Sequence, residues 1–291
     1  MREIAVLLFA VLLWLGGWGL NEYLVRLRPG SRSMTARVNL AVPAIFGVCL
    51  LLVWEVLARG LPIPPILLPA PSMIVMTALQ SLDVIAQDFV QTVLKEVLTG
   101  YVLGCGAGIL CAFAIDRSTF LKNGLLPLGN LVSALPIVGL APIMIMWFGF
   151  EWPSKAAIIV TMIFFPMLIN TLSGLSAAGH MERDLMRTYA ASWWQTMIAL
   201  RLPAAWPFIF NALKINSTLA MIGAIVAEFF GSPTVGLGFR ISTEMGRMNT
   251  AMVWAEILAA AIAGSLFYGI VALIERRVTF WHPSVRGGQR S

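Results

Sequence analysis

The chain has 291 residues, of which 59% are hydrophobic and only 12% are charged. Soluble domains are about half apolar and about a quarter charged, so the composition excludes an ordinary water-soluble fold. A disordered or collagen-like chain is also excluded, because the glycines and prolines follow no fixed period. The formal net charge of +6 is spread thinly between apolar runs, which fits a membrane-topology signal better than nucleic-acid binding. We therefore expect an integral membrane protein that binds no nucleic acid.

Seven apolar stretches are long enough, or nearly long enough, to cross a bilayer as helices. A hydrocarbon core of about 30 Å needs about 20 mostly apolar residues per helix. A β-barrel would instead show strict alternation over segments of about ten residues, whereas these runs are continuous. The sequence thus predicts an all-α, polytopic transmembrane helical bundle. The expected spans are residues 4–20, 38–58, 92–115, 124–148, 156–174, 208–230 and 251–274.

The distribution of positive charge predicts the orientation. Lys and Arg number thirteen in one set of alternating loops and five in the other, and the richer set is expected to be cytoplasmic. This places the C-terminus and the loop 175–207 inside the cell. The first span could be a cleaved signal peptide, but no small-residue cleavage site precedes the Arg-rich segment. We expect a retained helix with the N-terminus outside.

Prolines interrupt two parts of the chain. Residues 60–72 contain five prolines and are expected to form an ordered external loop. The span 124–148 is broken by prolines and glycines, and interrupted backbone at membrane depth survives only where protein or a water-filled cavity satisfies it. Two interpretations of this span remain open: a helix that lines a pathway, and a kinked helix that packs between its neighbours.

In the expected third span, residues 92–115, Gly104 and Gly108 are four residues apart and predict a close contact with another helix.

Polar side chains inside the spans are candidates for a substrate path, because intramembrane polarity is costly and usually faces a cavity or a partner. Each has an alternative role. An asparagine or serine can bond within its own helix or cross-link two helices, and the glutamate can reach water or pair with Arg240. The candidates are Asn130, Ser133, Asn170, Thr171, Asn216, Ser217 and Glu228.

Other charged residues are expected near the ends of the spans. Glu55 is assigned to the membrane interface, and Lys95 and Glu96 to a helix entrance. The spans then hold no cation at depth, which favours a neutral or aromatic ligand over a small anion.

The sequence carries no recognisable catalytic centre or metal site. The two histidines are far apart, the three cysteines lie in apolar runs without partners at metal-ligand spacing, and HExxH and GxSxG motifs are absent. The GxxxxGK[ST] loop is absent as well, so this chain is not itself an ATPase. An intramembrane lipid enzyme and an independent secondary transporter or channel remain as alternatives.

The segment 175–207 is too polar in its first half to span a membrane, yet its apolar residues recur every three or four positions. They are Leu185, Met186, Tyr189, Trp193, Met197 and Leu200. This spacing predicts an amphipathic helical stretch, in which Ala190 and Ala191 would let the backbone turn. Two interpretations remain: a helix at the membrane surface, or a docking element for a soluble protein.

The same segment resembles the EAA loop of permease subunits of ATP-binding-cassette (ABC) importers. That pattern is Glu-Ala-Ala, three residues, Gly, nine residues, Ile, one residue and Leu-Pro. Its spacing is kept here from Asp184 through Ala190 and Leu200 to Leu202 and Pro203. Five identities depart from it, since Asp replaces Glu, Leu and Met replace the two alanines, Ala replaces Gly, and Leu replaces Ile.

Further segments are similar to the branch of that family that carries sulfonates, nitrate, taurine, riboflavin and pyrimidine vitamin precursors. They include LPAPS at 68–72, ALPIVGLAPIMIMWFGF at 134–150 and IGAIVAEFFG at 222–231. The resemblance implies an extra N-terminal helix and basic segment at 1–37. It also implies a six-helix ABC importer transmembrane domain at 38–275, with the coupling loop 175–207, and a cytoplasmic basic tail at 276–291.

The resemblance further implies a non-catalytic permease in the bacterial plasma (inner) membrane, present as two copies, with two ATPase subunits and an extracytoplasmic substrate-binding protein. No cofactor is expected in this chain, and ATP and magnesium would be bound by the partner ATPase. The tail at 275–287 is more similar to that of the riboflavin or pyrimidine-precursor permeases, which favours such a solute. A permease for sulfonate, taurine or nitrate is the alternative. The residues expected to contact the ATPase are Arg183, Asp184, Arg187, Ala190, Ala191, Trp193, Trp194, Leu200, Leu202 and Pro203.

Overall fold

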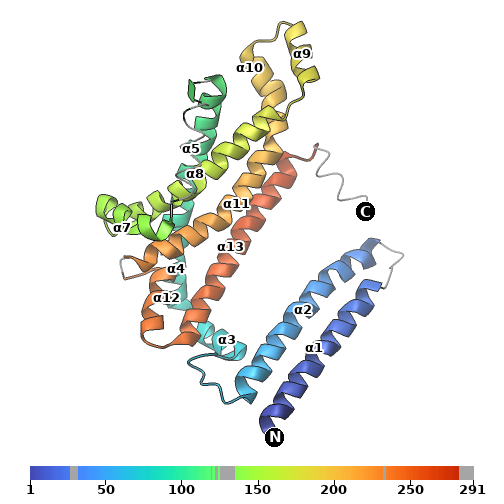
Figure 1. Cartoon of the computed structure of the whole chain (residues 1–291), viewed down its shortest axis with the longest axis vertical. Helices are drawn as coiled ribbons and strands as arrows, with labels where there is room; N and C mark the ends of the chain where they lie inside the picture. The colour runs from blue at the N-terminus through green and yellow to red at the C-terminus, as the bar shows by residue number, and fades with distance from the viewer. Residues whose placement is uncertain (27–31, 119, 122–123, 125–134, 232–233, 282–291) are drawn as a thin grey trace. The chain divides into compact units, whose positions relative to one another are not determined.

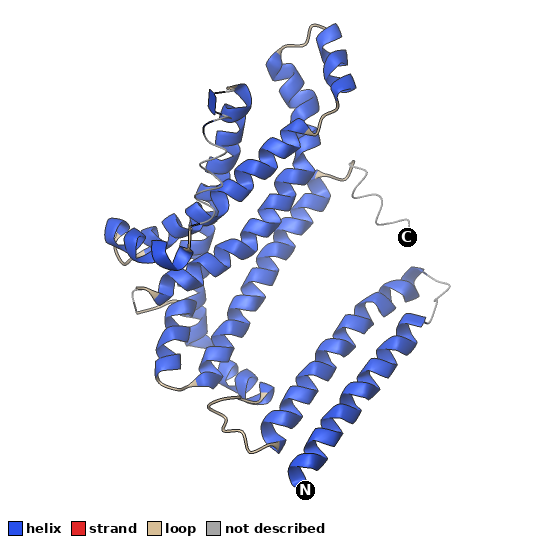
Figure 2. Cartoon of the chain, viewed as in Figure 1, coloured by secondary structure: helices blue, strands red, loops and turns tan. Residues whose placement is uncertain are grey.

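The computed structural model describes residues 1–26, 32–118, 120–121, 124, 135–231 and 234–281. Every regular element in these ranges is a helix (Figure 2). Six helical stretches are long and apolar enough to cross a membrane, which confirms the all-α polytopic bundle. They are Arg2–Arg26, Arg37–Gly60, Leu82–Arg117, Trp152–Ser176, Trp193–Phe229 and Thr250–Val278.

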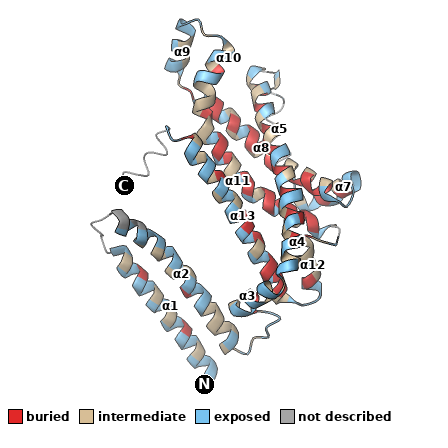
Figure 3. Ribbon diagram, turned by 180° about the vertical axis from the view of Figure 1, so that it is seen from behind, coloured by how far each residue is buried: buried red, intermediate tan, exposed pale blue. Residues whose placement is uncertain are grey.

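The chain forms two compact units. Unit 1 comprises residues 1–82 and 243–255, and unit 2 comprises residues 83–242 and 256–291. Buried residues concentrate on the helices of unit 2, whereas the first two helices of unit 1 are mostly exposed (Figure 3). Each unit is described by itself.

Unit 1 begins with an antiparallel helical hairpin, in which α1 (Arg2–Arg26) lies beside α2 (Arg32–Gly60) (Figure 1). Gly17 allows the two helices to approach, because a Cβ atom at this position would lie 2.4 Å from the Sγ atom of Cys49. The proline-rich residues 61–70 are not helical, as predicted.

The short helix α3 (Pro71–Gln80) begins at the last proline of that loop, a position where the missing N–H group costs nothing. Glu55 ties the end of α2 to this start. Its carboxylate accepts hydrogen bonds from the backbone N–H (2.9 Å) and hydroxyl (2.6 Å) of Ser72, and it also pairs with Arg59.

Unit 2 is built around α8 (Trp152–Ser176), which packs between α5 (Leu98–Arg117) and α11 (Leu202–Phe229). The α5 helix continues a longer stretch that starts with α4 (Leu82–Phe89) and passes through a π-helical segment, η1 (Val90–Val97). The last long helix, α13 (Thr250–Val278), contributes Ala260 and Ala263 to the same core.

Glycines on α5 set its distance from α8. A Cβ atom at Gly104 would lie 2.6 Å from the side chain of Ile163, and one at Gly108 would lie 2.8 Å from both the Met167 side chain and the Phe164 carbonyl oxygen. The predicted close contact is therefore confirmed. It extends one turn further, because Gly100 faces Ile159 in the same way.

The expected span 124–148 is only partly described, since residues 125–134 lie outside the described ranges. Its described part is α7 (Ile137–Phe148), a helix of 12 residues that begins after Pro136. At about 1.5 Å per residue it is about 18 Å long, which is too short to cross a bilayer alone. Pro136 lies directly before α7, as a break there requires, whereas the breaks expected at Gly139 and Pro142 are absent because both residues lie inside α7.

Replacing Gly108 with valine should destabilise unit 2 by about 1–3 kcal/mol, because the new side chain meets a backbone carbonyl that cannot move aside. Gly106→Val is the matched control, since a Cβ atom there has no neighbour within 4 Å. Thermal unfolding in detergent should show a lower midpoint for Gly108→Val than for Gly106→Val. Equal midpoints would contradict the close contact.

Candidate functional site

The segment 175–207 forms a helical hairpin followed by a transmembrane helix. Its parts are α9 (His180–Thr188), α10 (Trp193–Thr196), the π-helical η2 (Met197–Arg201) and the start of α11. The hairpin projects beyond the ends of α8 and α11 (Figure 1). The chain turns at residues 189–192, at the small pair Ala190 and Ala191 where the sequence allowed a turn within the amphipathic stretch.

The turn depends on the backbone of Ala190, which has a φ of +52°. The N–H of Ala190 donates to the carbonyl of Arg187 (2.9 Å), and the N–H of Ala191 donates to the carbonyl of Met186 (3.0 Å). These two bonds form a Schellman motif, which usually has glycine at the left-handed position. The next helix starts with a capping box, in which Ser192 and Gln195 each bond the other's backbone N–H.

The two tryptophans of α10 have different surroundings. Trp194 is 61% exposed, whereas Trp193 is half-buried against the core of unit 2 and lies under the guanidinium group of Arg117, 5.2 Å from its ring centre. Of the two tryptophans, only Trp194 is therefore available as an exposed anchor. Tyr189 at the turn is 77% exposed, and Leu185 on α9 is exposed as well.

Hydrogen bonds attach the base of this hairpin to the bundle. Arg201 donates to both carboxylate oxygens of Asp116 (2.7 and 2.6 Å) and to the carbonyl of Leu175 (3.0 Å). The two charged side chains are only 14% and 13% exposed. This pair was not predicted from the sequence, because no spacing rule relates residues that are 85 positions apart.

The remaining coupling candidates lie around these contacts. Arg183 donates to the carbonyl of Ser176 (2.7 Å), which spans the short linker between α8 and α9. Asp184 and Arg187 form an exposed pair at 3.5 Å. Leu200, Leu202 and Pro203 are half-buried in η2 and the first turn of α11.

A second group of polar residues is buried where α12 (Leu237–Gly246) begins. Glu228 of α11 accepts hydrogen bonds from the Thr92 hydroxyl (2.7 Å) and from the N–H groups of Gly238 (2.5 Å) and Phe239 (3.3 Å). Its exposed fraction is 1%. Glu228 thus caps the start of α12. The alternative that its carboxylate reaches water is wrong, because the side chain is buried.

Arg240 has a carboxylate partner in Asp88 of α4. Its Nε atom donates to Asp88 Oδ2 at 2.8 Å, and the N–H of Gly236 donates to Asp88 Oδ1 at 2.7 Å. Asp88 is fully buried. The pairing of Arg240 with Glu228 that the sequence suggested is therefore not the one formed.

Two charged residues, Glu96 and Lys155, are buried inside unit 2. Glu96 belongs to η1 rather than to a helix entrance, and Lys155 lies in the first turns of α8; both are fully buried. The ammonium group of Lys155 donates to the carbonyl of Phe150 and interacts electrostatically with Glu96 and Glu228. Lys155 is thus a buried cation at the start of a span rather than at its depth, and its neighbours are anionic.

The substrate-path candidates fall into three groups. Asn130 and Ser133 lie outside the described residues. Asn170, Thr171 and Ser217 donate to carbonyls of their own helices at 2.7–2.8 Å. Asn216 instead cross-links two helices, because its amide donates to the carbonyl of Ile163 on α8 (3.1 Å), while its Oδ1 atom has no partner among the described residues.

A groove of about 470 Å³ runs between α11 and α13 and is mostly apolar. Three hydroxyl side chains that the sequence analysis did not select line it: Thr218, Ser265 and Tyr268. Such a groove can accept either a solute or a helix. Hydroxyl residues in apolar helices give no periodic signal, which explains why they were missed.

Ala190→Gly should stabilise the α9–α10 turn by about 1 kcal/mol, because glycine removes the cost of a left-handed residue with a Cβ atom. Hydrogen exchange of the α9 amides should slow about fivefold. Ala191→Gly is the matched control and should leave this exchange unchanged or make it faster. If both variants behave alike, the turn does not have the described backbone.

Comparisons with known proteins agree with this architecture. A family model described as "binding-protein-dependent transport system inner membrane component" matches residues 104–280. The chain is 29% identical over 269 residues to a putative aliphatic sulfonates transport permease protein of Bacillus subtilis, which covers 92% of this chain and 95% of that protein. It is 29% identical to a formylaminopyrimidine transport permease protein of Halalkalibacterium halodurans, with 82% and 95% covered. It is 27% identical to a riboflavin transport system permease protein of Chloroflexus aurantiacus, with 81% and 88% covered.

The family match covers more than half of the chain, and the six long apolar helices make it a multi-pass membrane protein. The chain therefore belongs to the binding-protein-dependent inner membrane components, the non-catalytic permease subunits of ABC importers for small solutes.

Proposed function

We propose that this chain forms the translocation path of an ATP-driven importer and that the segment from α9 to η2 docks onto a separate ATPase subunit. The observation that carries the proposal is the projecting hairpin of α9 and α10, with its exposed apolar tip and its fixed base. A coupling element needs both properties, because its tip must bind the partner and its base must pass the movement on.

The tip has the composition of an interface anchor. Tyr189 and Trp194 offer large exposed aromatic surfaces, and residues of this type carry most of the binding energy in many protein interfaces. Asp184 and Arg187 lie nearby and are exposed, so they can serve as polar residues around the apolar centre.

The base connects the tip to three long helices. Arg201 directly precedes α11, Asp116 lies in the last turn of α5, and Leu175 lies in the last turn of α8. A displacement of the docking segment would therefore act on α5, α8 and α11 together. The partly buried Arg201–Asp116 pair is expensive to break, because separation would leave one charge without its partner.

The complete importer in this proposal has two copies of the chain, two ATPase subunits and an extracytoplasmic binding protein, and its C-terminus is cytoplasmic. ATP and magnesium are bound by the ATPase subunits. ATP binding would bring the two docking segments together and turn the path outward, and hydrolysis would return it inward. Since a ligand shifts such an equilibrium only by binding one state better, the path should hold its solute weakly.

For the solute we propose riboflavin or a pyrimidine-type precursor. Two relatives carry the names of formylaminopyrimidine and riboflavin permeases, and the buried Lys155 is compensated by Glu96 and Glu228 rather than free for an anion. A sulfonate, taurine or nitrate permease is the second candidate. The sulfonate relative, which matches 92% of this chain, favours it.

The docking proposal predicts co-purification. The tagged chain, isolated from its native membrane in mild detergent, should bring a P-loop ATPase in about equal amount. Trp194→Ser should lower the recovered ATPase at least about tenfold, because it removes an exposed aromatic anchor. Trp281→Ser is the matched control, since this exposed tryptophan lies outside the docking segment.

Two results would contradict the docking proposal. Recovery of the chain alone as a stable assembly would favour a secondary transporter or a channel. Equal ATPase recovery from Trp194→Ser and Trp281→Ser would favour a helix at the membrane surface.

The solute proposal predicts a selective uptake. Cells that express the chain with its ATPase and binding protein should accumulate labelled riboflavin or formylaminopyrimidine at least about tenfold faster than cells with the Trp194→Ser chain. Labelled taurine should show no such difference. The opposite pattern would select the sulfonate, taurine or nitrate alternative.

A further inference from the structure

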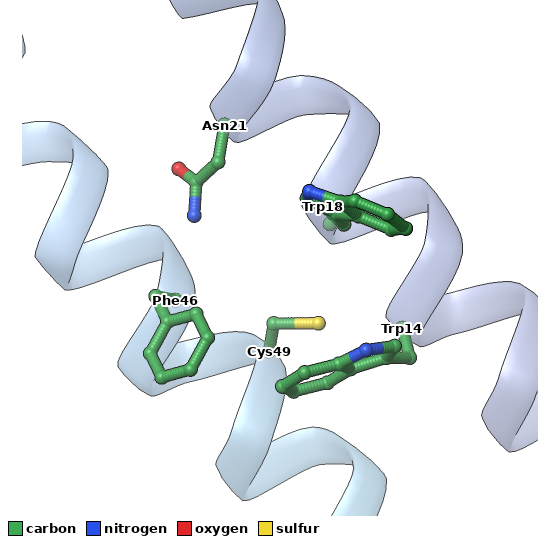
Figure 4. Close-up of a pocket in the computed structure, with 6 residues that line it drawn as sticks. Trp14, Trp18, Asn21, Phe46 and Cys49 are labelled. Atoms are coloured by element: carbon green, nitrogen blue, oxygen red, sulfur yellow. The ribbon is translucent and has the colours of Figure 1, made fainter. Parts of the chain in front are cut away.

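The hairpin of α1 and α2 contains a cavity of about 310 Å³ (Figure 4). Three aromatic side chains surround it: Trp14 and Trp18 from α1, and Phe46 from α2. Trp14 and Phe46 meet edge to face, with ring centres 5.5 Å apart. Both helices are long and apolar enough to cross a membrane, so the cavity lies within a membrane-spanning pair.

One polar side chain faces this aromatic space. Figure 4 shows Asn21 across from the rings of Trp18 and Phe46. Asn21 is only 8% exposed, and its Oδ1 atom has no hydrogen-bond partner in the part of the chain that the structure describes. A buried carbonyl oxygen without a hydrogen bond is costly, so this atom favours a donor from elsewhere.

The neighbouring donors, which are the indole N–H groups of Trp14 and Trp18 and the thiol of Cys49, do not supply that hydrogen bond. The thiol of Cys49 already donates to the carbonyl of Leu13 at 3.5 Å. Gly17 places this thiol close to α1 and so closes one side of the cavity. Trp18 is 63% exposed, which leaves an opening between the helices toward their surroundings.

We infer that this cavity binds a lipid-soluble ring compound with a hydroxyl group, such as a phenol or a fused-ring alcohol, whose O–H donates to Asn21. A lipid acyl chain would fill the same volume but would leave the Asn21 oxygen unsatisfied. Flat rings fit the aromatic walls, because aromatic pairs favour edge-to-face and offset-stacked contacts. The volume is at the small end of ligand pockets, which suits about two rings. The site is separate from the docking segment and does not depend on the transport proposal.

Two photoreactive probes test this inference, since they differ by one hydrogen-bond donor. The full-length chain in lipid nanodiscs is irradiated with 4-hydroxybenzophenone or with 4-methoxybenzophenone, and peptide mass spectrometry locates the adducts. The hydroxyl probe should label α1 and α2 around the cavity at least about fivefold more than the methoxy probe. Asn21→Leu should reduce its labelling to the level of the methoxy probe.

Asn39→Leu is the matched control, because Asn39 is an exposed asparagine of α2 that does not line the cavity. It should leave the labelling unchanged. Equal labelling of the wild-type chain by both probes, or adducts spread evenly along the hairpin, would overturn the inference. The comparison of probes needs no variant, so it remains decisive if Asn21→Leu does not fold.

Discussion

Hydrocarbon offers no hydrogen bonds, so a polar group that this chain buries is costly unless it finds a partner. The start of α12 shows how strongly this constraint acts. The N–H groups of Gly236, Leu237 and Gly238 have no carbonyl acceptor within their own helix, and side chains of α4, η1 and α11 accept all three. Elements that are far apart in the sequence are thus held at one place by the need to satisfy a helix end.

Hydrophobicity and glycine spacing were sufficient to predict much of the fold. Local sequence patterns predicted the long spans, the break at Pro136 and the close packing of α5 on α8. Such patterns do not depend on how the helices of a bundle are arranged. The positions of Glu96 and Lys155 could not be predicted in this way. A buried charge is tolerated only because of its partners, and these come from other helices. The assignment of residues 1–37 and 38–275 to separate domains stays a prediction.

The docking segment was located by the spacing of its apolar residues, but that spacing does not place the turn, because intervals of three and four continue on both sides of it. The small pair Ala190 and Ala191 indicated where the backbone could turn, without fixing its conformation. The EAA-like pattern carried the missing information. Its glycine position falls on Ala190, the residue that adopts the left-handed backbone, although the side chain there is not glycine. The contacts of this segment with an ATPase stay a prediction.

The π-helical segment η1 determines the relative phase of the two ends of one long helix. A π turn contains more residues than an α turn, and each residue of an α-helix advances its side chain by about 100°. Upstream of this segment Asp88 faces Arg240, and downstream Gly100 and Gly104 face α8. A sequence with one residue fewer between these points could keep only one of the two faces in register. The number of residues in η1 is therefore as constrained as their identity. Single-residue deletions should be tolerated less in η1 than in the loop 61–70.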